Sequence, residues 1–185
     1  MRISAILLTA GLSSRMEGDN KMLLPLGSSS VVAHTFKQLV NSGVNEIVVV
    51  TGNDSDLVHS EIRNQSRRIG TEIGRFVRNS NYEKGLTTSI QAGLRVIDHA
   101  DAVMICLGDM PLIKTEDYRF LMDSFANQKE YSIQMPFYQG QKGNPVIFGK
   151  AHFQEILNHT EMNGCSALVQ RNSESVCRIQ VSSDR

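Results

Sequence analysis

The sequence predicts an α/β fold with three layers, in which helices cover both faces of a doubly wound, mostly parallel mixed sheet. Short, almost continuously apolar runs alternate along the chain with amphipathic segments of helical period. Three runs, Ile3–Leu8, Glu46–Thr51 and Ala102–Leu107, have the apolar character of strands that are buried on both faces. Because helical segments separate these strands, right-handed crossovers are expected to place them in parallel.

Amphipathic helices are predicted between and after these strands. The first, at residues 31–41, follows serines that suit an N-cap, and Gly43 lies where a helix end favours a left-handed residue. A later helix, at residues 115–127, opens on Thr115 as its predicted cap. The remaining elements are predicted as helices at 54–64, 86–97, 151–157 and 165–170 and as strands at 132–137, 145–148 and 177–181.

Length and composition bound the class of protein. The 185 residues suit one domain over 1–185, and 41% of them are apolar, as in ordinary globular proteins. Lys and Arg together number 19, as do Asp and Glu, so the formal net charge is zero. A neutral chain argues against a bulk electrostatic grip on nucleic acid or on a membrane, but it leaves room for a local phosphate site.

Neither a zinc site nor an export signal is expected. The three cysteines and five histidines have no spacing typical of zinc ligands, and an odd number of cysteines predicts no disulfide framework. The apolar run at the N-terminus is too short for a signal peptide, and no window approaches the length of a transmembrane helix. The sequence therefore predicts a cytoplasmic protein.

A small, polar, glycine-containing loop follows the first strand, in the stretch LLTAGLSSRMEGDNKMLL at residues 7–24. It lacks both the GxxxxGK[ST] pattern of a P-loop and the GxGxxG pattern of a dinucleotide-binding fold. Its composition still suits a polyphosphate, because small residues let backbone N–H groups approach anionic oxygens and cations bind phosphate. The small residues are Ala10, Gly11, Ser13 and Ser14, and the cations are Arg15 and Lys21. A surface loop with two solvated cations has the same composition, so residue chemistry alone leaves both interpretations open.

An aspartate, Asp109, follows the third predicted strand and precedes Pro111. The carboxyl ends of parallel strands meet at one edge of a sheet, so Asp109 is expected beside the loop at residues 9–21. Two interpretations are open for its carboxylate. It is either a turn or cap residue that accepts from backbone amides, or a ligand of Mg²⁺, which binds through one or two carboxylates together with water and substrate phosphates.

Four segments together resemble the nucleotidyltransferases that act on molybdenum cofactor, a family within the wider pyrophosphorylase-like superfamily. The first loop is similar to the family signature L-x-A-G-x-S-x-R-M-G-x-x-K-x-L-x-x-L. Later segments are similar, in the family's order, to its N-x-x-x-G-x-x-x-S, G-D-[MQ]-P and G-[HN]-P elements. The matching residues are Leu8, Ala10, Gly11, Ser13, Arg15, Met16, Lys21, Leu23 and Leu26, then Asn81, Gly85 and Ser89, and then residues 108–111 and 143–145.

The resemblance implies a Rossmann-like nucleotide-diphospho-sugar transferase fold and an Mg²⁺-dependent nucleotidyl transfer. It implies that Arg15 and Lys21 stabilise charge, that Asp109 holds the metal, and that Gly85 and Ser89 contact the nucleobase. The triphosphate would lie on Ala10, Gly11, Ser13, Ser14, Arg15 and Lys21. Without the resemblance, Gly85 is a simple turn residue and Ser89 an ordinary residue in the first turn of a helix.

CTP is the nucleotide that the resemblance favours. Members that use cytidine tend to carry A-A-G in the first loop and G-[HN]-P later, whereas members that use guanosine tend to carry A-G-G. This chain has T-A-G at residues 9–11 and N-P-V at residues 144–146, which lies nearer to the cytidine pattern. Thr9 departs from both patterns, and we expect that position to contribute mainly its backbone.

The implied acceptor is the phosphorylated pterin of molybdenum cofactor, with Asn144 as a candidate contact and a molybdenum hydroxylase as a candidate partner. Asn144 before Pro145 is also typical of a turn that starts a strand. Three alternatives remain: a GTP-using enzyme, a sugar- or alditol-phosphate nucleotidyltransferase, and a non-catalytic nucleotide-binding protein that delivers cofactor to a molybdenum hydroxylase. A regulator of purine oxidation is also compatible with the sequence.

One departure from the family concerns a second carboxylate. After the segment that matches residues 179–184, relatives continue into an acidic D-[IV]-D-T-P stretch that can supply a second metal ligand. The sequence ends at Arg185 without that stretch, and Asp184 does not occupy its position. We therefore expect the second ligand either to lie beyond this sequence or to be missing.

Overall fold

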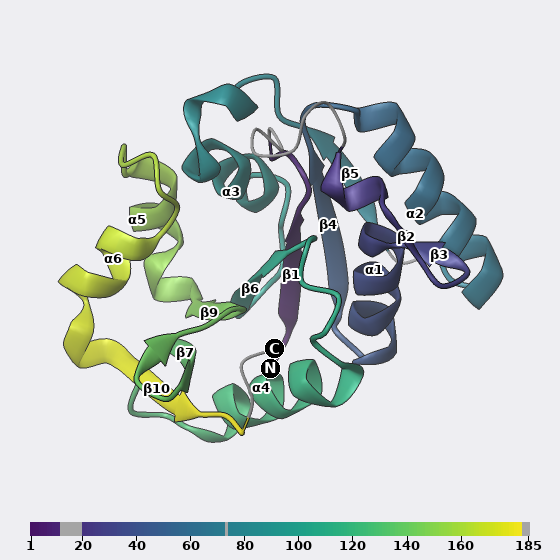
Figure 1. Ribbon diagram of the computed structural model, residues 1–185. Coiled ribbons are helices and arrows are strands. Elements are labelled where there is room, and N and C mark those ends of the chain that lie inside the picture. The colour runs from purple at the N-terminus through teal and green to yellow at the C-terminus, as the bar shows by residue number, and fades with distance from the viewer. Residues whose placement is uncertain (12–19, 73, 183–185) are drawn as a thin grey trace.

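The computed structural model describes residues 1–11, 20–72 and 74–182. Its main sheet is mixed, with strands in the order β10-β7-β9-β6-β1-β4-β5 and with β8 beside β7 (Figure 1). The strands are β1 (Ile3–Leu8), β4 (Glu46–Thr51), β5 (Arg75–Arg78), β6 (Ala102–Leu107), β7 (Ile133–Tyr138), β8 (Gln141–Lys142), β9 (Val146–Gly149) and β10 (Val176–Gln180). A separate hairpin joins β2 (Pro25–Leu26) to β3 (Ser29–Ser30).

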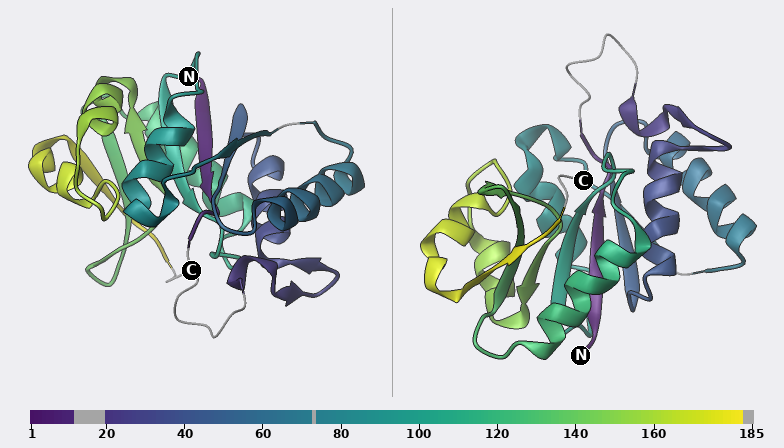
Figure 2. Two further views of the ribbon diagram at one scale, coloured as in Figure 1. Left: turned by 90° about the horizontal axis from the view of Figure 1, so that it is seen from above. Right: turned by 60° about the horizontal axis from the view of Figure 1, so that its bottom comes forward.

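Helices cover both faces of the sheet, so the predicted three-layer α/β architecture is confirmed. One face carries α1 (Val31–Asn41), α2 (Ser55–Ile69) and α4 (Thr115–Asn127), and the other carries α3 (Leu86–Leu94), α5 (Phe153–Asn158) and α6 (Ser166–Arg171). Short single-turn helices complete the chain: η1 (Lys21–Leu23), η2 (Tyr82–Lys84), η3 (Lys150–His152) and η4 (Ser173–Ser175). Figure 2 shows from two further directions that α2 lies at one end of the molecule and α5 and α6 at the other.

Side chains of the central strand are divided between two cores. In β1, Ala5 and Leu7 pack with α1, α2 and α4, whereas Ile6 and Leu8 pack with α3 and the C-terminal helices. All of these side chains are at most 3% exposed. Burial on both faces leaves no position for a polar, solvent-facing residue in most of the strand, which explains its almost continuous apolar sequence.

The direction of the strands sets the place of the loops. β1 pairs in parallel with both of its neighbours, so that Leu8 lies opposite Val50 of β4 and Leu107 of β6. The loops that leave β1 and β6 therefore start side by side at one sheet edge. Beyond β6 the direction changes, because β9 is antiparallel to both β6 and β7.

The predicted strands and helices are found with small shifts, and two strands of the main sheet, β5 and the two-residue β8, were missed. β5 reads RFVR, and its two arginines are exposed, so the segment lacks the apolar run that marked the other parallel strands. The helix predicted at 54–64 continues to Ile69 and ends at Gly70, whose φ of 67° is left-handed. The helix predicted at 86–97 ends at Leu94.

Two predicted helix caps differ from those in the structure. Ser30 occupies the N-cap position of α1 but makes no capping bond through its side chain. Thr115 is the first helical residue of α4 rather than its cap, and its hydroxyl donates to the Gln38 Oε1 atom at 2.7 Å. The Asp117 carboxylate instead accepts from the Lys114 backbone N–H at 2.9 Å. Gly43 has the left-handed conformation expected of it, with a φ of 82°.

No helix within the described ranges has both the length and the apolar character needed to cross a bilayer.

The packing of α3 on the sheet predicts that Gly93→Ala destabilises the fold. A Cβ at Gly93 would lie 2.6 Å from Ile6 Cγ2 and 2.9 Å from Val50 Cγ2. Overpacking of this kind costs about 1–3 kcal/mol, whereas the helix propensity of alanine returns at most about 1 kcal/mol. We expect the midpoint of urea unfolding to fall, while the dependence of the free energy of unfolding on urea concentration stays unchanged. Ser60→Ala, on the exposed face of α2, is the control and should leave the midpoint nearly unchanged. An unchanged midpoint for Gly93→Ala would contradict this account of the packing.

Candidate active site

A pocket of about 340 Å³ opens at the edge of the sheet where β1 and β6 end. It lies between the loop after β1, the segment at η1, the N-terminus of α3 and the residue that follows Gly108. Six predicted site residues line it: Ala10, Gly11, Lys21, Gly85, Ser89 and Asp109. The expectation that the loops after the first and third apolar strands meet at one edge is therefore confirmed. Ser13, Ser14 and Arg15 lie outside the described residues.

Lys21 is held at the pocket by η1 and its cap. The Asn20 side chain accepts from the Met22 backbone N–H at 3.0 Å and closes the first turn of η1. The Nδ2 atom of Asn20 also donates to Asp54 Oδ2 at 3.0 Å, which ties η1 to the residue that precedes α2. Lys21, the first residue of η1, lines the pocket with its side chain 42% exposed.

Asp109 is placed by the end of β6. The Gly108 backbone N–H donates to the Leu8 carbonyl at 2.9 Å, and the Gly108 carbonyl accepts from the Thr35 hydroxyl at 3.2 Å. These bonds join β6 to β1 and to α1 immediately before Asp109. A Cβ at Gly108 would lie 3.0 Å from Thr9 Cγ2 and 3.1 Å from the Leu8 carbonyl oxygen, so the chain passes here with little room.

Lys21 and Asp109 lie in direct contact on the wall of the pocket. The Lys21 ammonium group donates to Asp109 Oδ2 and forms an ion pair with it. Among the described residues, no backbone amide donates to the Asp109 carboxylate, so the interpretation of this residue as a turn cap finds no support. The carboxylate is 27% exposed and therefore accessible from the pocket. A phosphate group entering the pocket would compete for Lys21, and a cation would compete for Asp109.

The residues of the pocket fit a divalent cation that is shared with a phosphate ligand. Mg²⁺ needs only one or two protein carboxylates when phosphates and water complete its coordination. Asp109 supplies one carboxylate, and Glu83 lies elsewhere on the pocket wall. The part of the chain that the structure describes contains no group of three or more side chains able to hold a metal by themselves.

Thr9 has a structural role at the end of β1. Its side chain is fully buried, and its hydroxyl donates to the Val50 carbonyl at 2.9 Å, as does its backbone N–H at 2.9 Å. The side chain therefore joins the end of β1 to β4. Ala10 and Gly11, which follow, line the pocket, and a Cβ at Gly11 would meet no atom of the described residues within 4 Å.

Gly85 and Ser89 lie at the N-terminal end of α3. Gly85 has a φ of 103°, and a Cβ there would lie 2.6 Å from the Met162 carbonyl oxygen. The close approach of the chain at Met162 thus requires a glycine, independently of any ligand. Ser89 is 3% exposed, and its Oγ atom accepts from Asn79 Nδ2 at 2.9 Å.

Asn79 is a functional candidate that sequence reasoning missed. Its Nδ2 atom donates to the hydroxyls of Thr88 and Ser89, each at 2.9 Å, and its Oδ1 atom accepts from the Asn81 backbone N–H at 2.9 Å. It therefore fixes the start of α3 relative to η2 at the pocket wall. The residue directly follows β5, the strand without an apolar run, so nothing in the sequence marked its position.

A second pocket, of about 200 Å³, adjoins the first and shares Leu86 and Leu107 with it. Asn144 lines this second pocket, and the Asn144–Pro145 peptide bond is cis. Most of the wall is apolar: Leu86, Ile90, Ile105, Leu107, Met135, Val146, Phe148 and Val169. Asn144 also lines a smaller groove of about 140 Å³ between α4 and β8.

The one cysteine on the wall of the second pocket is a poor nucleophile. Burial of Cys165, with a smaller contribution from the negative charge of Glu155, raises the pKa of its thiol to about 12. The side chain therefore remains a neutral thiol at physiological pH. The Cys165 thiol is therefore unsuited to act as a nucleophile in the second pocket.

Solved structures share this fold. Rv0371c from Mycobacterium tuberculosis H37Rv superposes with a TM-score of 0.80 and 24% identity, over 97% of this chain and 88% of that chain. The same protein in complex with manganese gives a TM-score of 0.76 and 22% identity, over 98% and 89%. CMP:2-keto-3-deoxy-manno-octonic acid synthetase, solved with CTP, gives a TM-score of 0.73 and 12% identity, over 99% and 91%. This likeness confirms the Rossmann-like fold of nucleotide-diphospho-sugar transferases.

Sequence comparison identifies the family. The bifunctional protein GlmU of Clostridioides difficile strain 630 is 24% identical over 151 residues, which make up 81% of this chain and 30% of the relative. The chain thus spans about a third of the length of the curated relatives that it matches. Residues 5–176 match the model of the MobA-like NTP transferase domain, which is well over half of the 185 residues. This chain therefore belongs to the family of MobA-like NTP transferase domains.

Proposed function

We propose that this chain is a nucleotidyltransferase that transfers the CMP moiety of CTP to the terminal phosphate of molybdenum cofactor and releases pyrophosphate. The observation that carries the proposal is the placement of Lys21 and Asp109 in contact with each other in a pocket that also exposes Ala10 and Gly11. A second, mostly apolar pocket adjoins it and provides room for an acceptor. The proposal includes a single NTP-transferase domain over 1–185 and a location in the cytoplasm.

The triphosphate would lie on the loop after β1. Ala10 and Gly11 are small and line the pocket, which would let backbone N–H groups approach phosphate oxygens. Lys21 would exchange its contact with Asp109 for the phosphates and stabilise the negative charge that builds up on the leaving pyrophosphate. Ser13, Ser14 and Arg15 belong to the same proposed contact surface on the strength of the family resemblance.

The transfer itself needs little from the protein beyond positioning. A terminal phosphate oxygen of the acceptor forms a new bond to the α-phosphorus of CTP. The bond from that phosphorus to the bridging oxygen breaks, and pyrophosphate leaves with the electron pair. Because the attacking oxygen is already anionic, no general base is required, and catalysis consists of alignment and charge stabilisation.

Mg²⁺ is the proposed cofactor, and Asp109 is the residue that would hold it. When bound with the nucleotide, the ion would neutralise phosphate charge and favour the loss of pyrophosphate. The exposure of the Asp109 carboxylate to the pocket and the proximity of Lys21 support this assignment. The manganese complex of Rv0371c adds support for a divalent metal in a protein of the same fold.

Gly85 and Ser89 would contact the cytosine ring. Both residues line the pocket at the start of α3, on the wall formed with Leu86 and Tyr82. Asn79 would hold the Ser89 hydroxyl in a fixed orientation through its bond of 2.9 Å. The T-A-G sequence at residues 9–11 and the CTP complex of a protein of the same fold both support CTP over GTP.

The acceptor would occupy the second pocket. Its apolar wall suits a flat heterocycle such as a pterin, and Asn144 would contact the polar edge of that ring. A molybdenum hydroxylase is the proposed partner that receives the product. A sugar or alditol phosphate is the second candidate acceptor, and the likeness to a synthetase that acts with CTP on a sugar acid favours it.

Removal of either member of the ion pair should abolish turnover. Lys21→Ala and Asp109→Asn are each expected to lower the rate of pyrophosphate release by about 10²-fold or more, because each removes a charge that would act in the transition state. The measurement is pyrophosphate release with CTP, Mg²⁺ and molybdenum cofactor. Lys37→Ala, on the exposed face of α1, is the matched control and should retain the full rate. Near wild-type rates for both pocket variants would refute the proposed site.

The choice of nucleotide has its own test. With Mg²⁺ and molybdenum cofactor, CTP should support a higher kcat/KM for pyrophosphate release than GTP or ATP does. Replacing the acceptor with a sugar phosphate or an alditol phosphate should lower the rate, because the apolar wall of the second pocket would be left incompletely covered. Release with GTP alone would overturn the assignment of the base. Faster release with a sugar phosphate would overturn the assignment of the acceptor.

A further inference from the structure

The loop between α5 and α6 runs beside the junction of the two pockets. We call residues 159–165 the clasp loop. Its Met162 carbonyl approaches Gly85 so closely that a Cβ on that residue would lie at 2.6 Å. Asn163 and Cys165 of the same loop line the second pocket, next to Leu86, which both pockets share. The clasp loop therefore contacts the candidate nucleotide site on one side and the candidate acceptor site on the other.

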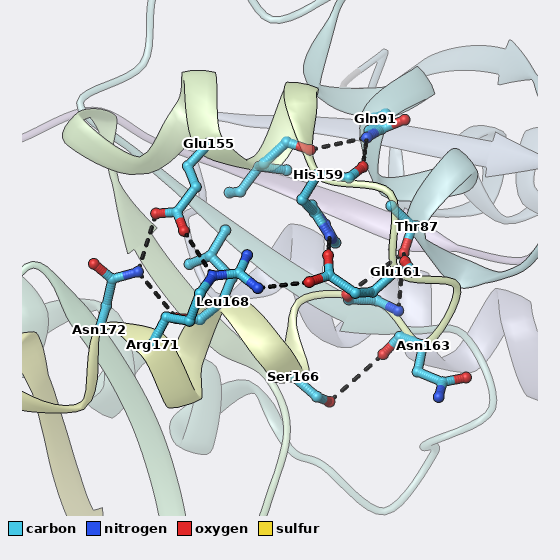
Figure 3. Close-up of polar contacts among 12 residues, drawn as sticks. Thr87, Gln91, Glu155, His159, Glu161, Asn163, Ser166, Leu168, Arg171 and Asn172 are labelled. Atoms are coloured by element: carbon cyan, nitrogen blue, oxygen red, sulfur yellow. Dashed lines mark hydrogen bonds and ion pairs between the residues drawn. The ribbon is translucent and has the colours of Figure 1, made fainter.

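Two buried side chains of α3 fasten the clasp loop to the sheet. The Thr87 hydroxyl donates to the Glu161 carbonyl and accepts from the Gly164 backbone N–H at 3.1 Å. One turn further along, Gln91 Nε2 donates to the His159 carbonyl at 3.0 Å. Figure 3 shows both side chains pointing into the loop from the same helix. The backbone of the clasp loop is thus held at both ends.

An ion pair fastens the middle of the loop to α6. Glu161 Oε1 lies 2.5 Å from Arg171 Nη1, and Glu161 Oε2 lies 2.7 Å from His159 Nδ1 (Figure 3). The Arg171 guanidinium is the largest cause that lowers the pKa of Glu161, to about 2, and the Glu161 backbone N–H and His159 add to it. Glu161 therefore stays anionic throughout the physiological range and keeps both partners.

A second carboxylate orients Arg171. Arg171 Nε lies 3.4 Å from Glu155 Oε1, and Asn172 Nδ2 donates to Glu155 Oε2 at 3.0 Å. The guanidinium plane is thereby set between two carboxylates, one on α5 and one on the clasp loop (Figure 3). Arg171 joins α5, α6 and the clasp loop in one polar cluster.

Asn163 is the clasp-loop residue with a side chain available for a ligand. Its backbone carbonyl accepts from the Ser166 hydroxyl at 3.5 Å, and its side-chain amide points away from the cluster (Figure 3). It brings an amide, able both to donate and to accept, to a pocket whose wall is mostly apolar. It joins Lys142, Asn144 and Ser166 as one of few polar side chains on this wall, and polar groups in a mostly apolar pocket usually fix the orientation of a ligand.

We propose that Asn163 recognises the polar edge of the acceptor in the second pocket, and that Arg171 positions it through Glu161. The inference rests on the proposed function, since it assigns the second pocket to the acceptor. The ligand class is a flat heterocycle with donor and acceptor groups on its rim. Asn163 is the specificity-determining residue, and Arg171 acts only through the clasp loop.

The test is the affinity of the intact protein for molybdenum cofactor, measured by titration calorimetry without CTP. Asn163→Ala should weaken this affinity about tenfold, because one hydrogen bond to the ligand is lost. Arg171→Gln should weaken it similarly, and Arg171→Lys should restore most of the affinity by keeping a cation beside Glu161. The affinity for CTP should stay within about twofold of wild type in all three variants.

The chain offers a matched control for the ion pair. Arg75 Nη2 lies 2.5 Å from Glu46 Oε1 near the opposite edge of the sheet, and its side chain is 50% exposed, against 47% for Arg171. Arg75→Gln removes an equivalent surface ion pair and should leave the affinity for molybdenum cofactor unchanged. If Arg171→Gln fails to fold, Glu161→Gln removes the same ion pair with an isosteric side chain, and the same loss is expected.

A double variant distinguishes a positioning role of Arg171 from a general destabilisation of the second pocket. If Arg171 acts only through Asn163, the variant Arg171→Gln with Asn163→Ala should bind no more weakly than Asn163→Ala alone. Additive losses would overturn the positioning role, and unchanged affinity in Asn163→Ala would overturn the recognition role. Affinity that depends on Asn163 without any pyrophosphate release would sustain this inference and refute the transferase. Pyrophosphate release with molybdenum cofactor, together with unchanged affinity in Asn163→Ala, would refute the inference alone. A wild-type chain that releases pyrophosphate only with another acceptor, and does not bind molybdenum cofactor, would refute both the inference and the proposed acceptor.

Discussion

The parallel pairing of β1 with β6 is the constraint on which the candidate active site depends. Leu8 lies opposite Leu107, and the Gly108 backbone N–H continues the ladder by donating to the Leu8 carbonyl at 2.9 Å. The loops that follow the two strands therefore begin side by side at the same edge of the sheet. One loop leads through Ala10 and Gly11 towards Lys21, and the other places Asp109 in contact with it. A change of register between these strands would separate the cation from the carboxylate and would also move each strand's side chains to the wrong core.

Two kinds of contact determine the shape of the pockets. Backbone bonds of the sheet fix the phosphate side, where β1, β4 and β6 meet and where Thr9 donates to Val50. Side-chain bonds fix the wall of the second pocket, where Thr87 and Glu161 hold a loop that lies outside the sheet. The free energy of a backbone ladder is nearly independent of residue identity, whereas side-chain anchors depend on particular residues. The wall of the second pocket is thus the part that substitutions can readily reshape.

Sequence reasoning predicted the elements whose burial is uniform. β1, β4 and β6 are apolar throughout because they are covered on both faces, and their bounds agree with the sequence-based ranges. The edge strand β5 has only two apolar residues, between two exposed arginines, and was missed, and with it Asn79, which follows it. Lys21 and Asp109 were predicted to meet because parallel strands end together. The clasp loop was beyond prediction, since Thr87 bonds to residues 74 and 77 positions away in the chain.

The antiparallel β9 has a consequence for how such a site diversifies. Because β9 runs against β6, the beginning of β9 lies at the sheet edge where β6 ends, and Asn144 reaches the second pocket from a strand start. The residues of the first pocket and Asn144 of the second thus come from segments that lie far apart along the chain. The strands beside them run in opposite directions at this sheet edge. Insertions at the turn between β8 and β9 can change the size of the second pocket. The ends of β1 and β6, which frame the first pocket, keep their register meanwhile. The antiparallel direction of β9 thus gives the fold two halves whose residues can change independently during evolution.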